Sequence, residues 1–324
     1  MKIGVVGVGR MGSVHARNLA GMLPAGSLLI HDSDPVVARK VADEVGGSVR
    51  PTAVALVEDA DAVVVVTPAT ERSGVLDAAM TKGIAVFCEK PLAAGLVQAR
   101  AVAETARRTG ARVQVGFQRR FDPEYRRLHR MVASGAAGQV LMIRGTAFDH
   151  QPPGPEYRTT AGDIFTDCLI HDIDAARWIA HDEVVAVQAD ACEVTGNDRQ
   201  GIGMGTLVLS FAGGGVAVLT ASRLNPLGYD HRMEVLGTRL SMAAGRNAAD
   251  RTSEAPAFTG FVDRFATAYR AEMRAFLALA AGDGPSRCGP DDAVKAQEIA
   301  AAAATATHTG VRTSVAPHDG ALTH

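Results

Sequence analysis

A short apolar run followed by three closely spaced glycines opens the chain and constrains its fold most strongly. Residues 2–6 form the run, and Gly7, Gly9 and Gly12 follow in GxGxxG spacing. In a strand–turn–helix unit, the first glycine permits the tight turn, the second lets the backbone approach a pyrophosphate, and the third lets helix and strand pack closely. The helix N-terminus adds N–H donors for phosphates. The residues expected to bind a dinucleotide here are Gly7, Gly9, Arg10, Met11 and Gly12.

An acidic residue follows at the distance that such a unit requires. Asp32 directly follows the next predicted strand, residues 27–31, and lies 20 residues beyond Gly12. Its carboxylate can accept hydrogen bonds from ribose hydroxyls and would repel a 2′-phosphate, so we expect NAD and not NADP. The alternative is that Asp32 is a turn residue, and Asp34 could equally cap the next helix. We favour the cofactor role for Asp32 and the cap for Asp34.

The remaining pattern divides the chain in two, as expected for 324 residues. Up to residue 121, apolar strands alternate with helical patterns, which is typical of a parallel sheet covered on both faces. Beyond it, consecutive strands with tight connections indicate antiparallel pairing. We therefore predict an α/β protein with an N-terminal Rossmann doubly wound parallel sheet in residues 1–121 and a C-terminal α/β domain with a large open, mostly antiparallel sheet in residues 122–324. The first domain would bind NAD, and the second would bind substrate and mediate oligomerisation.

The predicted elements can be stated as residue ranges. The strands of the first domain are expected at 2–6, 27–31, 62–66, 84–88 and 112–115. Those of the second are expected at 139–148, 184–194, 205–211, 216–222, 232–236 and 239–243. Its helices are expected at 122–134, 167–180, 260–281 and 290–309.

Composition excludes several classes of partner. The net charge is −2 and Lys and Arg are scattered, so we expect neither nucleic acid nor a membrane surface as partner. The apolar runs are far shorter than a membrane span, and the N-terminus enters a strand without a secretory pattern. The four cysteines lack paired spacing, which predicts reduced thiols in a cytoplasmic protein and no metal site. An open sheet face favours a homo-oligomer formed through the C-terminal sheet.

Two groups of residues suggest catalysis. The strand at 84–88 runs directly into Glu89-Lys90-Pro91, which places Lys90 at the carboxyl edge of the sheet, where ligands of such folds bind. Farther along, Asp167, His171 and Asp174 share one face of a predicted helix. An imidazole that titrates near neutrality suits proton abstraction from an alcohol. Taken singly, each of these residues is more often a solvated, capping or salt-bridge group.

Together these residues resemble the glucose–fructose oxidoreductase/inositol dehydrogenase family, and within it the inositol 2-dehydrogenases. The resemblance spans nearly the whole chain and rests on the glycine motif, the Glu89-Lys90-Pro91 turn and four further segments. These segments are 115–123, 167–178, 228–232 and 265–272. The resemblance implies an NAD-dependent dehydrogenase that oxidises a secondary hydroxyl of a cyclitol such as myo-inositol. It also implies a dimer or tetramer formed through the C-terminal sheet.

The resemblance also implies residue roles. Lys90, Asp167 and His171 would be catalytic, with His171 taking the hydroxyl proton and Lys90 hydrogen-bonding the developing alkoxide. The residues expected to contact substrate are Lys90, Arg119 or Arg120, Asp149, Asp167, His171, Asp174 and Tyr229. The residues expected to add to the cofactor site are Thr67, Pro68, Glu89 and Lys90.

The chain departs from the family pattern at three places. Where the family usually reads Thr-Pro-Asn-x-x-His, residues 67–72 read Thr-Pro-Ala-Thr-Glu-Arg, and Phe148 and Asp163 also replace usual residues. A sugar or aminocyclitol dehydrogenase is therefore the alternative substrate class. A sugar-sensing regulator that binds NAD is the alternative from another functional class.

Overall fold

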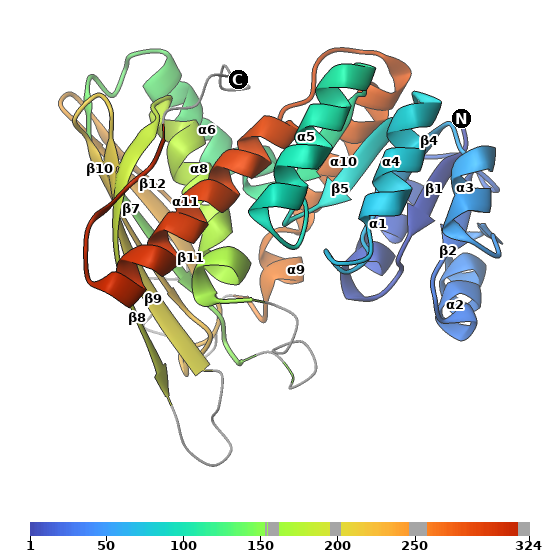
Figure 1. The fold of residues 1–324 in the computed structure, drawn as a ribbon, viewed down its shortest axis with the longest axis horizontal. Coiled ribbons are helices and arrows are strands. Elements are labelled where there is room, and N and C mark those ends of the chain that lie inside the picture. Colours follow the sequence, from blue (N-terminus) through green and yellow to red (C-terminus); the bar gives the residue numbers. More distant parts are fainter. Residues whose placement is uncertain (153, 155–161, 195–201, 246–257, 317–324) are drawn as a thin grey trace. The chain divides into compact units, whose positions relative to one another are not determined.

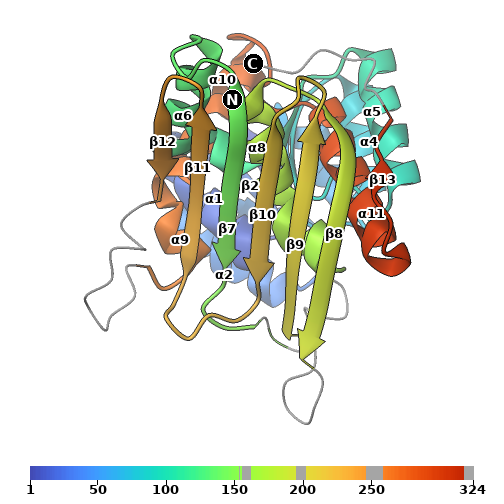
Figure 2. The ribbon, with the colours of Figure 1, turned by 90° about the vertical axis from the view of Figure 1, so that its left-hand side faces the viewer.

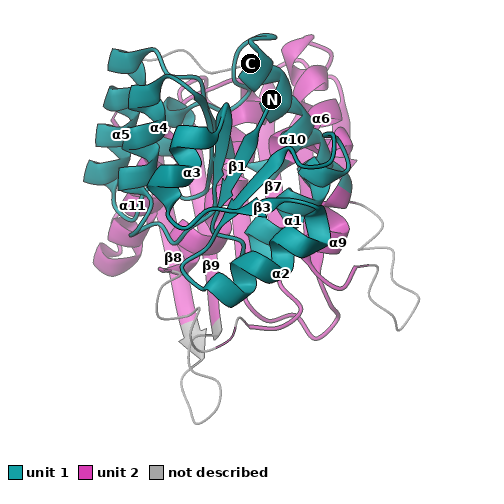
Figure 3. Ribbon diagram, turned by 90° about the vertical axis from the view of Figure 1, so that its right-hand side faces the viewer, with its two compact units in different colours: residues 1–118, 267–294, 323 teal, residues 119–266, 295–322, 324 magenta. Residues whose placement is uncertain are grey.

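The computed structural model describes residues 1–152, 154, 162–194, 202–245 and 258–316. The chain divides into two compact units, coloured separately in Figure 3. The first comprises Met1–Gln118 and Thr267–Val294, and the second comprises Arg119–Ala266 and the described residues from Lys295 onward. Thr267–Val294 therefore packs with the N-terminal residues, although the sequence analysis placed one domain boundary at residue 121.

The first unit contains a six-stranded parallel sheet in the order β3-β2-β1-β4-β5-β6 (Figure 1). Its strands are β1 (Ile3–Val6), β2 (Leu28–His31), β3 (Ser48–Val49), β4 (Ala62–Val65), β5 (Ala85–Glu89) and β6 (Val113–Gly116). Its helices are α1 (Arg10–Ala20), α2 (Pro35–Val45), α3 (Ala53–Asp59), α4 (Ser73–Lys82), α5 (Leu96–Thr109) and α10 (Ala266–Ala281). The strand order reverses between β1 and β4, and ligands of such sheets bind at the carboxyl ends of the strands around this point. The predicted Rossmann sheet is confirmed.

The core of the first unit explains its strand pattern. Every residue of β1 and β4 is buried, as expected for strands covered on both faces. Met273, Phe276 and Leu279 of α10 pack into the same apolar cluster as the strand residues. Helix α10, although it comes late in the chain, therefore completes the core of the first unit. Burial of its apolar stripe stabilises this packing.

The second unit contains a seven-stranded sheet in the order β12-β11-β7-β10-β9-β8-β13. Its strands are β7 (Val140–Phe148), β8 (Val184–Val194), β9 (Ile202–Phe211), β10 (Val216–Ser222), β11 (Asp230–Gly237), β12 (Ser241–Ala244) and β13 (Thr313–Ser314). Only the pairing of β7 with β10 is parallel; the others are antiparallel, which confirms a mostly antiparallel sheet. The remaining helical elements are η1 (Gln118–Phe121), α6 (Pro123–Ala133), η2 (Phe165–Leu169), α8 (Ile170–Ala180), α9 (Phe261–Arg264) and α11 (Pro290–Thr309).

The two faces of this second sheet differ. Along β10, Ala217, Leu219 and Ala221 are buried, whereas the residues between them are only half-buried. Figure 2 shows α8 behind the sheet and no described helix of the second unit in front of it. The sheet therefore has one covered and one open face. Among the described residues, no helix combines the length and hydropathy needed to cross a membrane.

Candidate cofactor and substrate sites

The glycine-rich turn after β1 has the geometry of a phosphate-binding loop. Gly7 adopts a φ of 82°, and a Cβ at Gly12 would lie 1.9 Å from the carbonyl oxygen of Gly7. A Cβ at Gly9 would meet nothing within 4 Å, so this position is open to an approaching ligand. No side chain caps the N-terminus of α1, which leaves its first N–H groups for an anion. Arg10 is exposed and Met11 half-buried at this helix start.

Asp32 connects the end of β2 to the glycine-rich turn. Its Oδ2 accepts a hydrogen bond from the backbone N–H of Val8 (2.7 Å), and its Oδ1 accepts one from the N–H of Asp34 (3.0 Å). An ionised carboxylate has about four acceptor positions, so two remain for ribose hydroxyls. Asp34 accepts hydrogen bonds from the N–H groups of Val36 and Val37 and confirms the predicted helix cap. The ribose contact of Asp32 stays a prediction.

The ends of β4 and β5 bring the next predicted residues to the same edge. Val65 pairs with Cys88, so Thr67 and Lys90 both lie just beyond the carboxyl ends of neighbouring strands. Lys90 is half-buried, precedes a cis peptide bond to Pro91, and donates its backbone N–H to Glu89 Oε2 (3.1 Å). The hydroxyl of Thr67 is buried and has no hydrogen-bond partner among the described residues. Buried polar atoms are nearly always satisfied, so this orphan hydroxyl fits a bound cofactor.

A buried cluster supports Glu89 from inside the first unit. His15 of α1 pairs through Nε2 with Glu89 Oε1 at 2.7 Å, and Glu272 of α10 offers an oxygen within 4.8 Å of both partners. Both carboxylate oxygens of Glu272 lack a hydrogen-bond partner among the described residues. Burial, and then the charge of Glu89, raise the pKa of Glu272 well above the usual carboxyl range. Burial among these residues therefore favours the neutral form of Glu272.

In the second unit, several polar residues meet at one end of the sheet. Asp149 follows β7 and Arg223 follows β10, and these two strands run parallel. β11 runs antiparallel to β7 and begins at the same end, where Asp230 pairs with Phe148. The backbone N–H of Asp149 donates to the carbonyl of Ser222 (2.8 Å), which ties the two strand ends together.

Asp167 lies at this end on η2, a π-helical turn that leads into α8. An Arg223–Asp167 ion pair of 3.2 Å holds its carboxylate, and Arg223 also donates to the carbonyl of Gly162 (3.1 Å). Asp163 caps the turn by accepting the N–H of Thr166 at 2.7 Å, which gives this departure from the family pattern a physical role. Such π-helical turns occur frequently at functional sites.

His171 follows in the first turn of α8 and is half-buried. Cys168, between the two predicted catalytic residues, is not a reactive thiol: burial, and then Asp167, raise its pKa to about 12.

Tyr229 and Asp149 lie around a histidine that the sequence analysis did not single out. The ring of His231 stacks on Tyr229 at 4.2 Å between centroids, its Nδ1 lies 2.9 Å from a guanidinium nitrogen of Arg119, and its Nε2 lies 3.8 Å from Asp149. Burial lowers the pKa of His231. The signal available in sequence was its position inside the segment 228–232.

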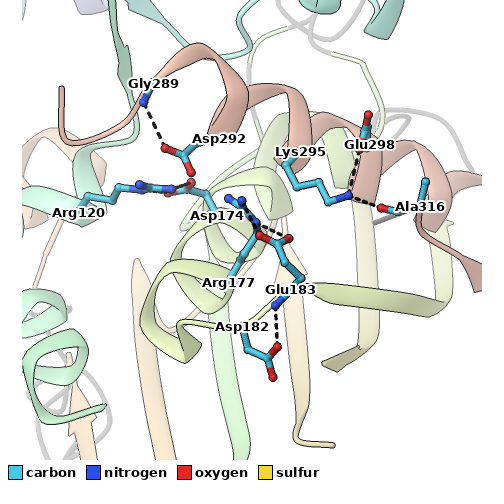
Figure 4. Close-up of polar contacts among 10 residues, drawn as sticks. All are labelled: Arg120, Asp174, Arg177, Asp182, Glu183, Gly289, Asp292, Lys295, Glu298 and Ala316. Carbon is cyan, nitrogen blue, oxygen red and sulfur yellow. Dashed lines mark hydrogen bonds and ion pairs between the residues drawn. The ribbon is translucent and has the colours of Figure 1, made fainter. Parts of the chain in front are cut away.

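Two buried ion pairs account for the other arginines. Arg120 binds Asp174 with two hydrogen bonds, from Nε (3.0 Å) and from NH2 (2.6 Å), and each side chain is at most 1% exposed (Figure 4). Arg119 pairs with Asp172 at 2.5 Å. The structure thus directs the predicted substrate residues Arg120 and Asp174 toward each other. Their contact with substrate stays a prediction.

Comparison with known proteins follows the division into two units. Residues 1–117 match the model of an oxidoreductase family with an NAD-binding Rossmann fold, and residues 125–243 match the GFO/IDH/MocA C-terminal domain. A myo-inositol dehydrogenase of Streptomyces leeuwenhoekii is 37% identical over 88% of this chain and 90% of that protein. An inositol 2-dehydrogenase of Rhizobium meliloti (strain 1021) is 32% identical over 86% of this chain and 88% of that protein.

Solved structures of inositol dehydrogenases are also similar to this chain over nearly its whole length. A myo-inositol dehydrogenase from Corynebacterium glutamicum ATCC 13032 has a TM-score of 0.87 and 28% identity, with 98% of this chain and 99% of that chain covered. A scyllo-inositol dehydrogenase from Lactobacillus casei with bound NAD(H) and scyllo-inositol has a TM-score of 0.86 and 25% identity, with 98% and 99% covered.

Proposed function

Because the chain belongs to the GFO/IDH/MocA family of oxidoreductases with an NAD-binding Rossmann fold, we propose that it oxidises a secondary hydroxyl of a cyclitol such as myo-inositol to a ketone. One observation carries the proposal: proteins named as inositol dehydrogenases match this chain over nearly its whole length. Lys90, Asp167 and His171, the residues that the chemistry requires, are all present. A regulator without turnover would have no need to retain all three.

The first unit supplies the cofactor residues. The N–H groups at the start of α1 and the open Gly9 would hold the pyrophosphate, and Asp32 would accept the ribose hydroxyls. Thr67 and Pro68 at the end of β4 would complete the site, with the orphan hydroxyl of Thr67 as the donor. NAD supplies the hydride acceptor when it is bound.

The protein's own residues handle the proton and the charge. His171 accepts the proton of the substrate hydroxyl as a general base, and Asp167, held by Arg223, steadies the imidazole as it becomes charged. Lys90 donates a hydrogen bond to the same oxygen and stabilises the negative charge that develops there. The hydroxyl proton thus ends on His171.

Substrate hydroxyls need further partners. We assign this role to Asp149, whose side chain is 34% exposed, and to Tyr229. His231 lies next to both, because its ring stacks on Tyr229 and its Nε2 is near Asp149. Carboxylate and phenol groups suit a ring that carries many hydroxyls, because the carboxylate accepts several hydrogen bonds and the phenol can both donate and accept.

We also propose that two copies pair through the open face of the second sheet, and that the protein works in the reducing cytoplasm, in keeping with its four free cysteines. Met204 and Val208 of β9 are exposed on the open face, and Val208 pairs with Val218 of β10. A Val218→Asp substitution should shift the molar mass measured by light scattering to that of a monomer, whereas Val262→Asp, on α9, should not. An unchanged mass would contradict pairing through this face.

The activity is tested with purified protein, NAD and a panel of inositols, aldoses and aminocyclitols, followed at the absorbance of NADH. We expect reduction of NAD with at least one inositol. Turnover with an aldose or aminocyclitol alone would replace the cyclitol assignment, and no turnover with any of them would remove the dehydrogenase assignment.

Two variants test the assigned roles. Lys90→Ala and His171→Ala should each lower kcat by about 100-fold or more while NAD still binds. The exposed Lys40→Ala and His308→Ala are matched controls. Normal turnover by either site variant would contradict the role of that residue.

A further inference from the structure

A buried arginine lies beneath the turn that carries Lys90. Arg72 is 3% exposed and immediately precedes α4. Its NH1 donates to the carbonyl oxygens of Glu89 and Pro91, the latter at 2.5 Å, and its NH2 donates to the carbonyl oxygen of Thr67. Arg72 therefore holds the backbone on both sides of Lys90 and joins this turn to the end of β4.

The charge of Arg72 is balanced in an unusual way. Among the described residues, no carboxylate forms an ion pair with it. The neighbouring thiol of Cys88, 3.6 Å from NH1, stays protonated because burial raises its pKa. The buried cation is thus compensated by three carbonyl oxygens and a neutral thiol. Burial of a charge without a charged partner destabilises the folded protein, so a functional role would explain why an arginine stands here.

An arginine suits these three acceptors better than any other side chain. The guanidinium is planar and holds its N–H donors in a rigid fork, so one side chain can serve carbonyls of two separate backbone segments at once. The ammonium of a lysine is a single point and cannot span them in the same way.

Hydrogen bonds hold the backbone around Lys90 at several points. Glu89 Oε2 accepts its N–H, and the carbonyls before and after it are held by Arg72. The root of the lysine side chain is therefore held from several directions. Catalytic groups need such support because a displacement of about 1 Å can cost about 100-fold in rate.

We propose that Arg72 is a positioning residue for the reaction: it fixes the backbone of Lys90 and, through Thr67, the end of β4 that adjoins the cofactor residues. This assignment rests on the proposed function, in which Lys90 contacts the reacting oxygen. Arg72 itself contacts neither substrate nor cofactor.

The test compares Arg72→Ala and Arg72→Lys with wild type, using the substrate found in the panel above. For Arg72→Ala we expect kcat to fall by about 10- to 100-fold, with the KM of the substrate changed less than about threefold. The kcat of Arg72→Lys should lie between that of wild type and that of Arg72→Ala. Guanidinium chloride at low millimolar concentration should restore part of the rate of Arg72→Ala and leave that of Arg72→Lys unchanged. Arg17→Ala, on the surface of α1, is the matched control.

A double-mutant cycle separates positioning from general support of the fold. If Arg72 acts on turnover through Lys90, adding Arg72→Ala to Lys90→Ala should lower the remaining rate less than about twofold at saturating NAD, because the group that it positions for the reaction is already gone. Equal fold losses in both backgrounds would overturn the proposal, and so would an Arg72→Ala variant with normal kcat. If Arg72→Ala does not fold, the same cycle with Arg72→Lys decides between these outcomes.

The two proposals can fail separately. Lys90→Ala with normal turnover would remove the proposed function and the role of Arg72 together. A large loss in Lys90→Ala with normal kcat in both Arg72 variants would overturn the role of Arg72 alone.

Discussion

Glu272 gives the protein a dependence of stability on pH that a single substitution should remove. Its side chain is fully buried, its oxygens lack hydrogen-bond partners among the described residues, and Glu89 lies close by. Of the two carboxyl groups, Glu89 has hydrogen-bond partners in His15 and the N–H of Lys90. Burial, and then the charge of Glu89, favour the neutral form of Glu272.

The sign follows from where that proton is bound. Burial and the charge of Glu89 raise the pKa of Glu272 in the folded state, whereas the unfolded chain has the usual value near 4.5. Between these two values the folded state holds one proton that the unfolded state has released. Stability then falls as pH rises, by about 1.4 kcal/mol per pH unit, and the fall ends at the folded pKa.

The assay is urea unfolding of wild type and the Glu272→Gln variant at fixed protein concentration, at several values between pH 5 and pH 8. The amide has nearly the same shape and does not titrate. The unfolding free energy of the variant minus that of wild type should therefore grow by about 1.4 kcal/mol per pH unit, or about 2.7 kcal/mol from pH 5.5 to 7.5 if the folded pKa lies above this range. The pH at which the difference stops growing measures the folded pKa.

The surface variant Glu58→Gln controls for removal of a carboxylate as such. A difference between Glu272→Gln and wild type that stays constant from pH 5 to pH 8 would refute the reasoning, because it would mean that Glu272 is ionised in the folded protein.

Three further substitutions test the structural basis of the two sites. Gly12→Ala should abolish NAD binding measured by calorimetry, because its Cβ would lie 1.9 Å from the carbonyl oxygen of Gly7; normal affinity would contradict the close packing of α1 on the turn. Asp34→Ala should cost about 1 kcal/mol in urea unfolding through loss of the α2 cap, and no change would show that the cap contributes nothing. Asp172→Asn should cost about 3–5 kcal/mol because it leaves the buried charge of Arg119 without its partner. The exposed pair of Arg144 and Glu234 is the control, since Glu234→Gln should cost less than about 1 kcal/mol.

The sequence predicted the first unit well because its signals are local. Continuous apolar runs gave β1, β4 and β5 within a residue or two, and the glycine spacing gave the turn geometry at Gly7 and Gly12. The strands β3 and β13 were missed because two residues carry no readable period. The parallel pairing of β7 with β10 was also out of reach, since it joins strands far apart in the chain.

The sequence did not predict the buried residues that surround the predicted site residues. His15 and Glu272 each interrupt the buried stripe of a helix, beside Leu19 on α1 and Phe276 on α10. A polar residue on an apolar stripe was the available signal, but its partner could not be named, because Glu89 becomes a neighbour only in the folded chain. In the sequence, Arg72 stood out only as part of the segment 67–72, which differs from the pattern of the family that the chain resembles, and its contacts with the Lys90 turn could not be predicted.

These supporting residues share an energetic cost, and that cost bears on function. Arg72 is a buried cation without a carboxylate partner among the described residues, and Glu272 is a buried acid that must keep its proton. Apolar residues in their places would avoid both penalties, so their presence is not explained by stability. Both groups lie close to the turn that carries Lys90. Arg72 binds the carbonyls of Glu89 and Pro91, on either side of Lys90. Glu272 lies near Glu89, whose carboxylate accepts the N–H of Lys90. Proteins accept local instability most often where a group must be held in place for chemistry, and both Arg72 and Glu272 lie close to the turn that carries Lys90.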